Sequence, residues 1–127
     1  MSKEIISTPK APAAIGPYCQ AVKANGFIFV SGQLAINPAT GEILKGSIAE
    51  KTELILSNIK ALLEDSGSSL EKCVRVGIFL TDMKDFAELN EVYKKYFSES
   101  LAARATVQVA GLPAGENIEI EVTALAE

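Results

Sequence analysis

The chain has 127 residues, 48% hydrophobic and 22% charged, which suits a single folded domain spanning residues 1–127 and argues against intrinsic disorder. No apolar run approaches the roughly 20 residues of a membrane-spanning helix, and residues 1–7 lack the apolar stretch of a secretory signal, so we expect a cytoplasmic protein. The net charge of −4, with 12 basic against 16 acidic residues and no dense basic cluster, argues against a nucleic-acid partner, although folding could gather distant lysines on one face.

Three strands are expected in the first third of the chain. The first two, near residues 3–7 and 19–23, flank a segment too rich in Pro and Gly for a helix. Asn25-Gly26 predicts a two-residue hairpin turn. It leads into a third strand over residues 27–34, which are rich in β-branched and aromatic side chains, and residues 37–41 are expected to form a turn.

Two helices are expected after this turn. Ser47 and Glu50 have the spacing of a capping box, which predicts the start of the first helix, and Gly67 is expected to end it in a left-handed conformation. Asp82 is expected to cap the second helix. Steps of three and four mark the buried faces: Ile48, Thr52, Ile55, Ile59 and Leu62 in the first helix, and Phe86, Leu89, Tyr93 and Tyr96 in the second.

Three further strands are expected, near residues 73–81, 104–110 and 117–125. The order β-β-β-α-β-α-β-β predicts an α+β fold in which two helices pack on one face of a mixed sheet. In the strand at 73–81, aliphatic residues alternate with other residues, which predicts that the aliphatic side chains share one face of the sheet. The aliphatic set is Val74, Val76, Ile78 and Leu80, and the opposite set is Cys73, Gly77 and Phe79.

The second face of this sheet is predicted to be apolar and to lack a helical layer. Phe27 and Phe29 alternate with Ile28 and Val30, so both faces of that strand are apolar. Monomers rarely expose so much contiguous apolar surface, which favours association with other subunits through the bare face. The alternative is that loops or the N-terminal segment cover it.

The chain contains no histidine, which limits the catalytic mechanisms that are available to it. Without it, Ser-His-Asp and Cys-His catalysis and the usual zinc ligand sets are excluded. Cys19 and Cys73 do not have metal-ligand spacing and are expected to be free thiols, Cys73 packing as a small apolar group and Cys19 being a candidate reactive thiol.

Arg104, flanked by alanines at the start of a strand, is a candidate carboxylate ligand because its planar fork matches a carboxylate in two hydrogen bonds. The alternative is a solvated arginine in a surface salt bridge. Glu119 and Glu121 lie on one side of a strictly alternating strand. They are either an exposed polar face or, if the bare face is an interface, partly buried carboxyls suited to proton transfer.

Tyr18 follows Gly16-Pro17, a rigid loop that could hold its phenol as a hydrogen-bond donor or pack it against the chain. Ser31-Gly32-Gln33 interrupts an apolar strand, where the glycine permits either a close backbone approach or a bulge.

Taken together, these segments resemble the Rid (reactive intermediate deaminase) family, and its RidA branch in particular. The resemblance runs essentially from end to end. It is carried by APAAIGPYCQA at 11–21, FVSGQ at 29–33, NPATGE at 37–42, ARATV at 103–107, and Leu112-Pro113 through Ile118-Glu119-Ile120.

The resemblance implies a chorismate-mutase-like α+β fold and a homotrimer with clefts between neighbouring subunits. It implies hydrolysis of reactive 2-imino acids and their enamine tautomers, such as 2-iminopropanoate and 2-iminobutanoate, to 2-keto acids and ammonia. No cofactor or metal is implied, and the expected small-molecule partner is the imino or keto acid.

The resemblance also assigns roles. Arg104 matches the substrate-carboxylate ligand, Tyr18 the cleft tyrosine, and Glu119 the acid that positions or polarises water. The other matched substrate-binding positions are Ser31, Gly32, Asn90 and Thr106. Position 106 departs from the family pattern, because many bacterial members have Cys where this chain has Thr. A thiol role is therefore not expected there, whereas backbone groups could serve unchanged.

Two other functions stay open at this point. Some relatives are described as ribonucleases or translation inhibitors, a function that the acidic balance and the lack of histidine make less attractive here. A chaperone-like protein that binds small carboxylates in the same clefts without turnover is the other alternative.

Overall fold

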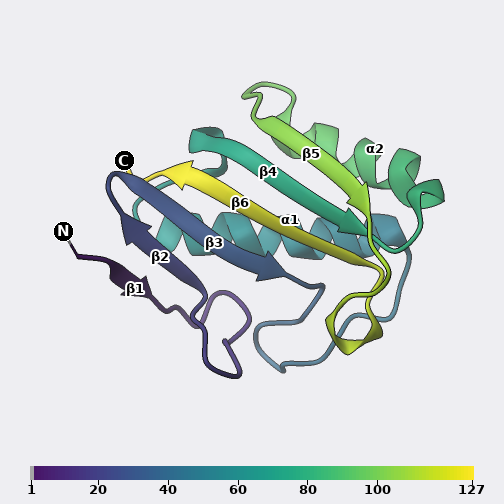
Figure 1. Cartoon of the computed structure of the whole chain (residues 1–127), viewed down its shortest axis with the longest axis horizontal. Coiled ribbons are helices and arrows are strands. Elements are labelled where there is room, and N and C mark those ends of the chain that lie inside the picture. Colours follow the sequence, from purple (N-terminus) through teal and green to yellow (C-terminus); the bar gives the residue numbers. More distant parts are fainter. Residues whose placement is uncertain (1) are drawn as a thin grey trace.

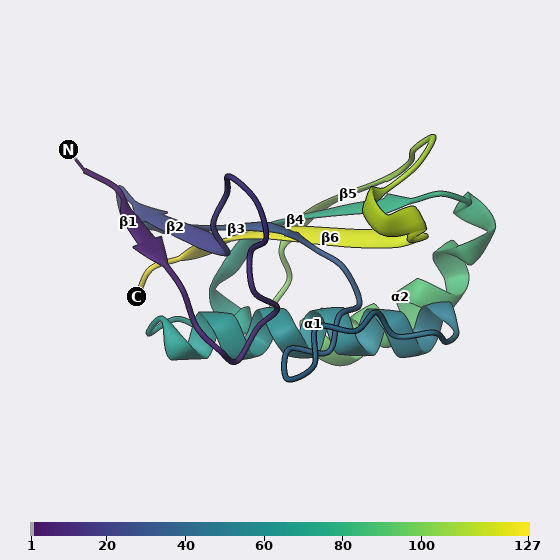
Figure 2. The same cartoon turned by 90° about the horizontal axis from the view of Figure 1, so that it is seen from below.

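The structure, a computed structural model, describes residues 2–127 and contains one six-stranded mixed sheet with two helices on one face (Figures 1 and 2). The main elements are β1 (Glu4–Ile6), β2 (Ala21–Ala24), β3 (Phe27–Gln33), α1 (Ile48–Asp65), β4 (Cys73–Leu80), α2 (Phe86–Phe97), β5 (Ala103–Gln108) and β6 (Ile118–Leu125). Short 3₁₀ helices are η1 (Leu70–Lys72), η2 (Met83–Asp85) and η3 (Pro113–Gly115).

The sheet order is β1-β2-β3-β6-β4-β5, in which β4 and β5 are parallel and every other pair is antiparallel. The predicted order of elements is confirmed, with strand boundaries displaced by no more than two residues. The core lies between the sheet and the helices, because the inward side chains of β3, β4 and β6 pack against the apolar faces of α1 and α2. None of the helices within residues 2–127 combines the length and apolar composition needed to cross a membrane.

Local sequence signals determine the turns and the ends of α1. Asn25 and Gly26 both have positive φ, 52° and 84°, which is the conformation of a type I′ hairpin turn. The Ser47 hydroxyl accepts from the Glu50 N–H at 3.1 Å, and the Ser47 N–H donates to the Glu50 carboxylate at 2.9 Å. Gly67, with φ 84°, follows the last turn. The predicted hairpin, capping box and glycine stop are therefore confirmed.

Asp82 caps a different element from the one predicted. Its carboxylate accepts from the Lys84 N–H at 2.9 Å and starts η2, and α2 begins only after this 3₁₀ turn, at Phe86. The short Asp side chain bonds the amide two residues ahead, which closes a tight turn before the α-helix can start.

The predicted faces of β4 are wrong at its first two residues. Cys73 is buried in the core, whereas Val74 is 39% exposed. Cys73 pairs with Ala124 and Arg75 pairs with Thr123, so Val74 is an additional residue in a β-bulge. Because side chains alternate with a period of two, one additional residue reverses the faces of the residues before it.

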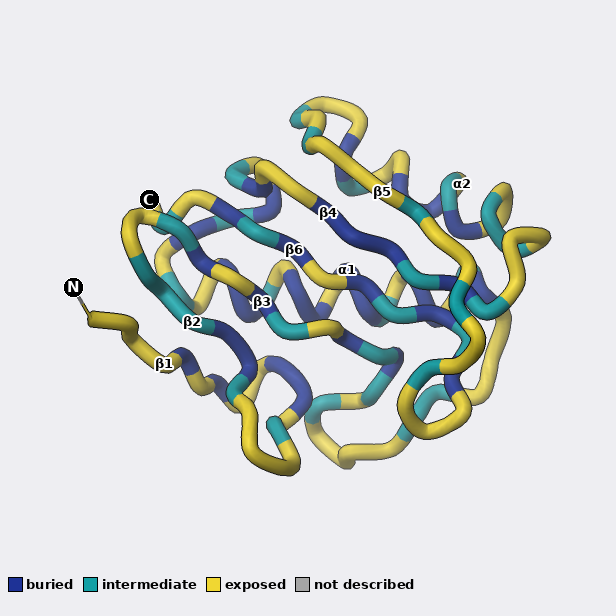
Figure 3. The backbone as a smooth tube through the Cα atoms, in the orientation of Figure 1, coloured by how far each residue is buried: buried dark blue, intermediate teal, exposed yellow. Residues whose placement is uncertain are grey.

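The sheet face opposite the helices is open and partly apolar. Neither α1 nor α2 covers it (Figure 2), and exposed segments of strand run across it (Figure 3). Phe29, Val107 and Leu125 are between 40% and 47% exposed. Neither loops nor the described N-terminal segment cover these three side chains, so the predicted bare face is present in the single chain.

Candidate active site

Arg104 is held on the helix side of the sheet by α2. It pairs in register with Val76, whose side chain lies in the core, so the Arg104 side chain leaves β5 on the same side. Its Nη1 donates to Asn90 Oδ1 at 2.8 Å, and its guanidinium carbon lies 4.6 Å from the Tyr93 ring centroid and 5.3 Å from that of Phe86. Two aromatic rings and one amide therefore orient the guanidinium.

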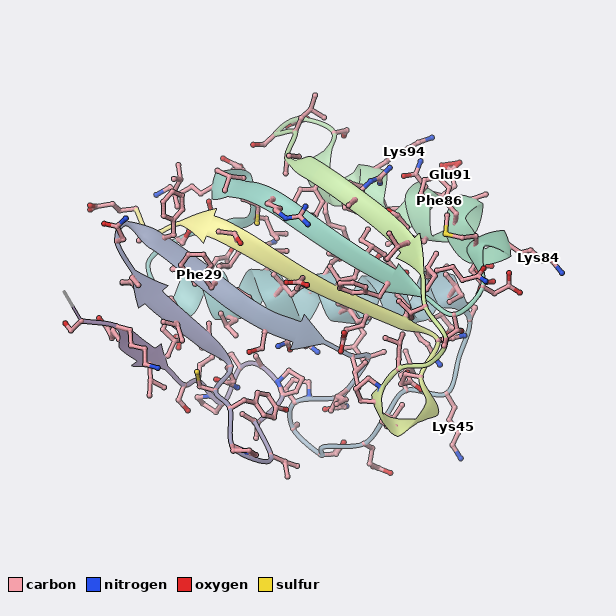
Figure 4. The ribbon with its side chains drawn as sticks, in the orientation of Figure 1. Phe29, Lys45, Lys84, Phe86, Glu91 and Lys94 are labelled. Carbon is pink, nitrogen blue, oxygen red and sulfur yellow. The ribbon has the colours of Figure 1, made fainter. Side chains whose placement is uncertain are left out.

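The guanidinium lines a cavity of about 470 Å³ between α2 and the segment that leads into β5. Figure 4 shows Phe86, Glu91 and Lys94 on α2 beside β5. Lys94 is paired with Glu91 at 3.0 Å. Among residues 2–127, no carboxylate forms an ion pair with Arg104. The arginine is therefore oriented by neutral groups and can receive an anion.

Thr106 follows on the same side of β5. Its Oγ1 atom is buried and has no hydrogen-bond partner among the described residues. The hydroxyl is thus not used to hold the strand in place.

Glu119 lies on the opposite, open face. It pairs with Phe79 across β6 and β4, and its carboxyl group lies over the backbone of Gly32 in β3. Burial raises the pKa of Glu119, and the negative charge of Glu121 raises this pKa further. Glu121 lies similarly over Gly77, so both acidic side chains lie along the sheet where glycines leave room. The carboxyl of Glu119 is therefore partly buried, which is the environment that suits a carboxyl group to proton transfer.

Gly32 serves both of the roles considered from the sequence. The register is irregular between Val30 and Gln33, which is a bulge, and this region is also where Glu119 approaches the backbone. The neighbouring Ser31 donates its hydroxyl to the Cys19 carbonyl at 2.7 Å and its N–H to the Gln20 carbonyl at 3.0 Å. Ser31 therefore attaches the loop that precedes β2 to the sheet.

The Gln20 side chain fixes this loop from within. Its amide nitrogen donates to the carbonyls of Thr8, Ala11 and Pro12 at 2.8–3.1 Å, and its oxygen accepts from the Thr8 N–H at 2.7 Å. The loop presents Tyr18, which is 57% exposed, to a second cavity of about 370 Å³. Sequence-predicted residues that line this cavity are Tyr18, Ser31, Gly32 and Glu119.

The candidate residues thus form two groups within one chain. Arg104 and Asn90 line the first cavity, on the helix side of edge strand β5, and Thr106 lies on the same side of that strand. Tyr18, Ser31, Gly32 and Glu119 line the second cavity, at the open face, and the two cavities share no lining residue. A single chain does not bring Arg104 and Glu119 together.

Phe86 and Tyr93 were interpreted from the sequence only as core residues of a helix. The spacing of Phe86, Asn90 and Tyr93, at steps of four and three, places them on one face of α2. Because Asn90 is a candidate substrate-binding residue, this shared helix face indicates that Phe86 and Tyr93 also lie at the site, where their rings contact Arg104.

Neither Cys19 nor Cys73 lines the cavity beside Arg104 or the cavity beside Glu119. Burial raises the pKa of the Cys73 thiol to about 12. Both cysteines are free, as predicted, and Cys19 is half-buried. Within residues 2–127, no three His, Cys, Asp or Glu side chains gather as a metal site.

Comparison with known proteins decides the family. A family model described as Endoribonuclease L-PSP matches residues 8–126. YyfA from Yersinia pestis, described as a protein of unknown function of the conserved Rid protein family, has a crystal structure that matches with a TM-score of 0.94 and 42% identity, over 98% of this chain and 99% of that chain. The chain belongs to the Rid family. The chorismate-mutase-like α+β fold expected of a Rid protein is confirmed.

Two curated relatives match nearly the whole chain. A RutC family protein of Pyrococcus abyssi is 53% identical over 127 residues, which is 100% of both chains. A 2-iminobutanoate/2-iminopropanoate deaminase of Bos taurus is 46% identical over 123 residues, which is 97% of this chain and 90% of that protein. The family assignment therefore does not depend on one local motif.

Proposed function

We propose that this Rid protein hydrolyses reactive 2-imino acids to 2-keto acids and ammonia. The observation that carries the proposal is the guanidinium of Arg104, which is oriented by Asn90 and two aromatic rings but has no acidic partner within residues 2–127. The name of the bovine relative supports 2-iminopropanoate and 2-iminobutanoate as substrates.

Arg104 is proposed to bind the substrate carboxylate. Its planar fork can form two parallel charge-assisted hydrogen bonds, each contributing about 1.5–3 kcal/mol. Since Asn90 holds one nitrogen and the rings hold the plane, little further ordering is needed when the ligand binds. The carboxylate in turn fixes the position of the adjacent imine carbon.

The reaction requires orientation more than a strong nucleophile, because an imine carbon is already electrophilic. A water molecule held by Glu119 adds its oxygen to the imine carbon, and one proton of this water is transferred to the imine nitrogen, which gives a carbinolamine. The hydroxyl proton of the carbinolamine is then transferred to the same nitrogen, the carbon–nitrogen bond breaks, and the products are ammonia and a 2-keto acid. Tyr18 and the backbone at Ser31 and Gly32 orient the nitrogen in this proposal, and Thr106 contributes backbone contacts.

Arg104 and Glu119 lie on opposite faces of one sheet, so the proposed site combines Arg104 of one subunit with Tyr18 and Glu119 of a neighbour. The open face with its exposed Phe29 and Val107 supports association. We therefore propose that residues 1–127 act as one domain of a homotrimer, in the cytoplasm. A monomer in analytical ultracentrifugation at micromolar concentration would contradict this assembly.

The deciding experiment generates 2-iminopropanoate from serine with a dehydratase and times the release of pyruvate and ammonia, with and without the protein. Arg104→Ala should lower kcat/KM about 100-fold or more, because two charge-assisted hydrogen bonds are lost. Lys84→Ala is the matched control, since the Lys84 side chain points away from the molecule (Figure 4). Near-normal turnover by Arg104→Ala would overturn the assignment.

Ribonuclease activity is the second candidate, because the matching family model carries that name. The net charge of −4 is unfavourable for binding a phosphate backbone. Cleavage of a labelled RNA at physiological salt, with no imine hydrolysis, would favour this candidate. Tight keto-acid binding without turnover would instead favour a protein that only binds small carboxylates.

A further inference from the structure

We propose that the cavity beside Arg104 receives the side chain of the imino acid, and that the protein therefore prefers longer aliphatic 2-imino acids to 2-iminopropanoate. This inference rests on the proposed function, because it requires Arg104 to hold the substrate carboxylate. It extends that function by assigning the chemical class of the substrate side chain to particular residues.

The cavity has the size and lining of a small-molecule site. Its volume of about 470 Å³ falls within the usual range of about 300–1,000 Å³. Tyr93 and Phe97, stacked with ring centroids 4.5 Å apart, lie beneath it. Ala102 and Leu101, from the segment that precedes β5, provide the other wall. The cavity therefore has an apolar lining that begins next to the guanidinium of Arg104.

Leu101 is an exposed apolar residue that lines the cavity, and it is 84% exposed in the single chain. An apolar side chain beside an arginine without an ion-pair partner fits a site that receives an apolar group with a carboxylate at one end. Burying each methylene of that group is expected to strengthen binding about fourfold, which corresponds to ~0.8 kcal/mol.

The charges around the cavity favour an apolar substrate side chain over a charged one. Lys94 is already paired with Glu91, and Asn90 is occupied by Arg104. Arg104 is the charged lining residue that forms no ion pair within residues 2–127. One carboxylate satisfies it, and a second charge on the ligand would compete with the existing Lys94–Glu91 pair.

The test measures Ki for a series of 2-keto acids, which are the stable products of the proposed reaction. The series is pyruvate, 2-ketobutyrate, 2-ketopentanoate and 2-ketohexanoate, used as competitive inhibitors of 2-iminopropanoate hydrolysis by the complete protein. We expect Ki to fall about fourfold for each added methylene that is buried. 2-Ketoglutarate, whose distal carboxylate extends into the cavity, should bind more weakly than 2-ketopentanoate.

Two variants test whether this cavity causes the trend. Leu101→Ser removes an apolar wall at an exposed position, so it should weaken binding of 2-ketohexanoate at least fivefold more than binding of pyruvate. Ser98→Phe, at an exposed lining residue, should fill the cavity and exclude the longer acids selectively. Ile5→Ser is the control, because Ile5 is also exposed but lies on β1 at the opposite edge of the sheet.

The failures of the two proposals are distinguishable. Imine hydrolysis with equal Ki values along the series, or a chain-length trend unchanged by Leu101→Ser and Ser98→Phe, overturns the side-chain site and leaves the deaminase function intact. Tighter binding of 2-ketoglutarate than of 2-ketopentanoate also overturns it, in favour of a second cationic contact. If isothermal titration calorimetry shows the expected trend in Kd for the same keto acids but no imine is hydrolysed, the cavity assignment stands and the proposed function fails.

Discussion

The carboxyl group of Glu119 lies directly against the backbone of Gly32. A methyl group at position 32 would lie 2.7 Å from the Glu119 carboxyl carbon and 2.9 Å from each of its oxygens. Side chains do not approach a Cβ atom that closely, so the absence of a side chain at position 32 permits the observed orientation of the acid.

Gly32→Ala is therefore expected to displace the carboxyl of Glu119 while the fold is retained, because the clash is with the end of a flexible side chain. A displacement of about 1 Å at a catalytic group can cost roughly 100-fold in rate, and we expect kcat/KM for imine hydrolysis to fall by about that factor. Gly111→Ala is the control, since nothing lies within 4 Å of its added methyl group. Equal kcat/KM for the two variants would mean that the orientation of Glu119 is not important.

Phe86→Leu tests the aromatic support of Arg104. The Phe86 ring lies 5.3 Å from the guanidinium carbon. A cation–π contact of this kind contributes about 0.5–1 kcal/mol, so kcat/KM should fall about two- to fivefold. The loss should appear mainly in KM, because the contact holds Arg104 equally before and during the reaction. A loss confined to kcat would show that Phe86 acts in another way.

The pH profile should report on Glu119. Burial and the charge of Glu121 raise the pKa of Glu119 above its usual value of 4.5. If the carboxylate holds the water, activity rises as the pH increases through this raised pKa. Glu121→Gln removes the negative charge that helps to raise the pKa of Glu119, so it should move the acidic limb of the kcat/KM profile to lower pH. Glu64→Gln, an exposed substitution on α1, should not move the limb.

The same raised pKa predicts an effect on stability. The folded state holds the Glu119 proton to higher pH than the unfolded chain does. The stabilisation that results is fully present at pH values below the pKa of Glu119 in the unfolded chain. It is lost as the pH rises through the higher pKa of Glu119 in the folded protein. The Tm of Glu119→Gln, relative to the Tm of the unsubstituted protein, should therefore increase as the pH rises from acid to neutral. An identical Tm difference at both pH values would contradict this linkage.

Thr106→Val should raise the Tm without lowering imine hydrolysis. The Oγ1 atom of Thr106 is buried without a partner among the described residues. A buried polar group left without a hydrogen bond costs about 1–3 kcal/mol, which an isosteric methyl group would avoid. If the hydroxyl contacts the substrate instead, kcat/KM would fall while the Tm rises, and Thr106→Ser would restore activity.

Local signals predicted most of the secondary structure. The Asn25-Gly26 turn, the Ser47–Glu50 capping box and the Gly67 stop each involve residues a few positions apart, so their physical causes are visible in the sequence. The alternation of β6 likewise placed Glu119 on the face opposite the core. The roles of Arg104, Tyr18 and Glu119 came from the family resemblance and stay predictions.

Several features of the site were decided only by tertiary structure. The bulge that exposes Val74 depends on the register between β4 and β6, which brings together residues far apart in the chain. The contact of Glu119 with Gly32 depends on β3 lying beside β6. Arg104 obtains its supports from α2 because the chain returns to form β5 parallel to β4.

The separation of Arg104 from Glu119 shows where the sequence alone stops being informative. The sequence determined which strands carry these side chains, because alternation within one strand is a local property. Only the assembled sheet decided that they lie on opposite faces, because that depends on how β4, β5 and β6 pair with one another. Long-range pairing cannot be read from local periodicity, since it is selected by the burial of the whole core.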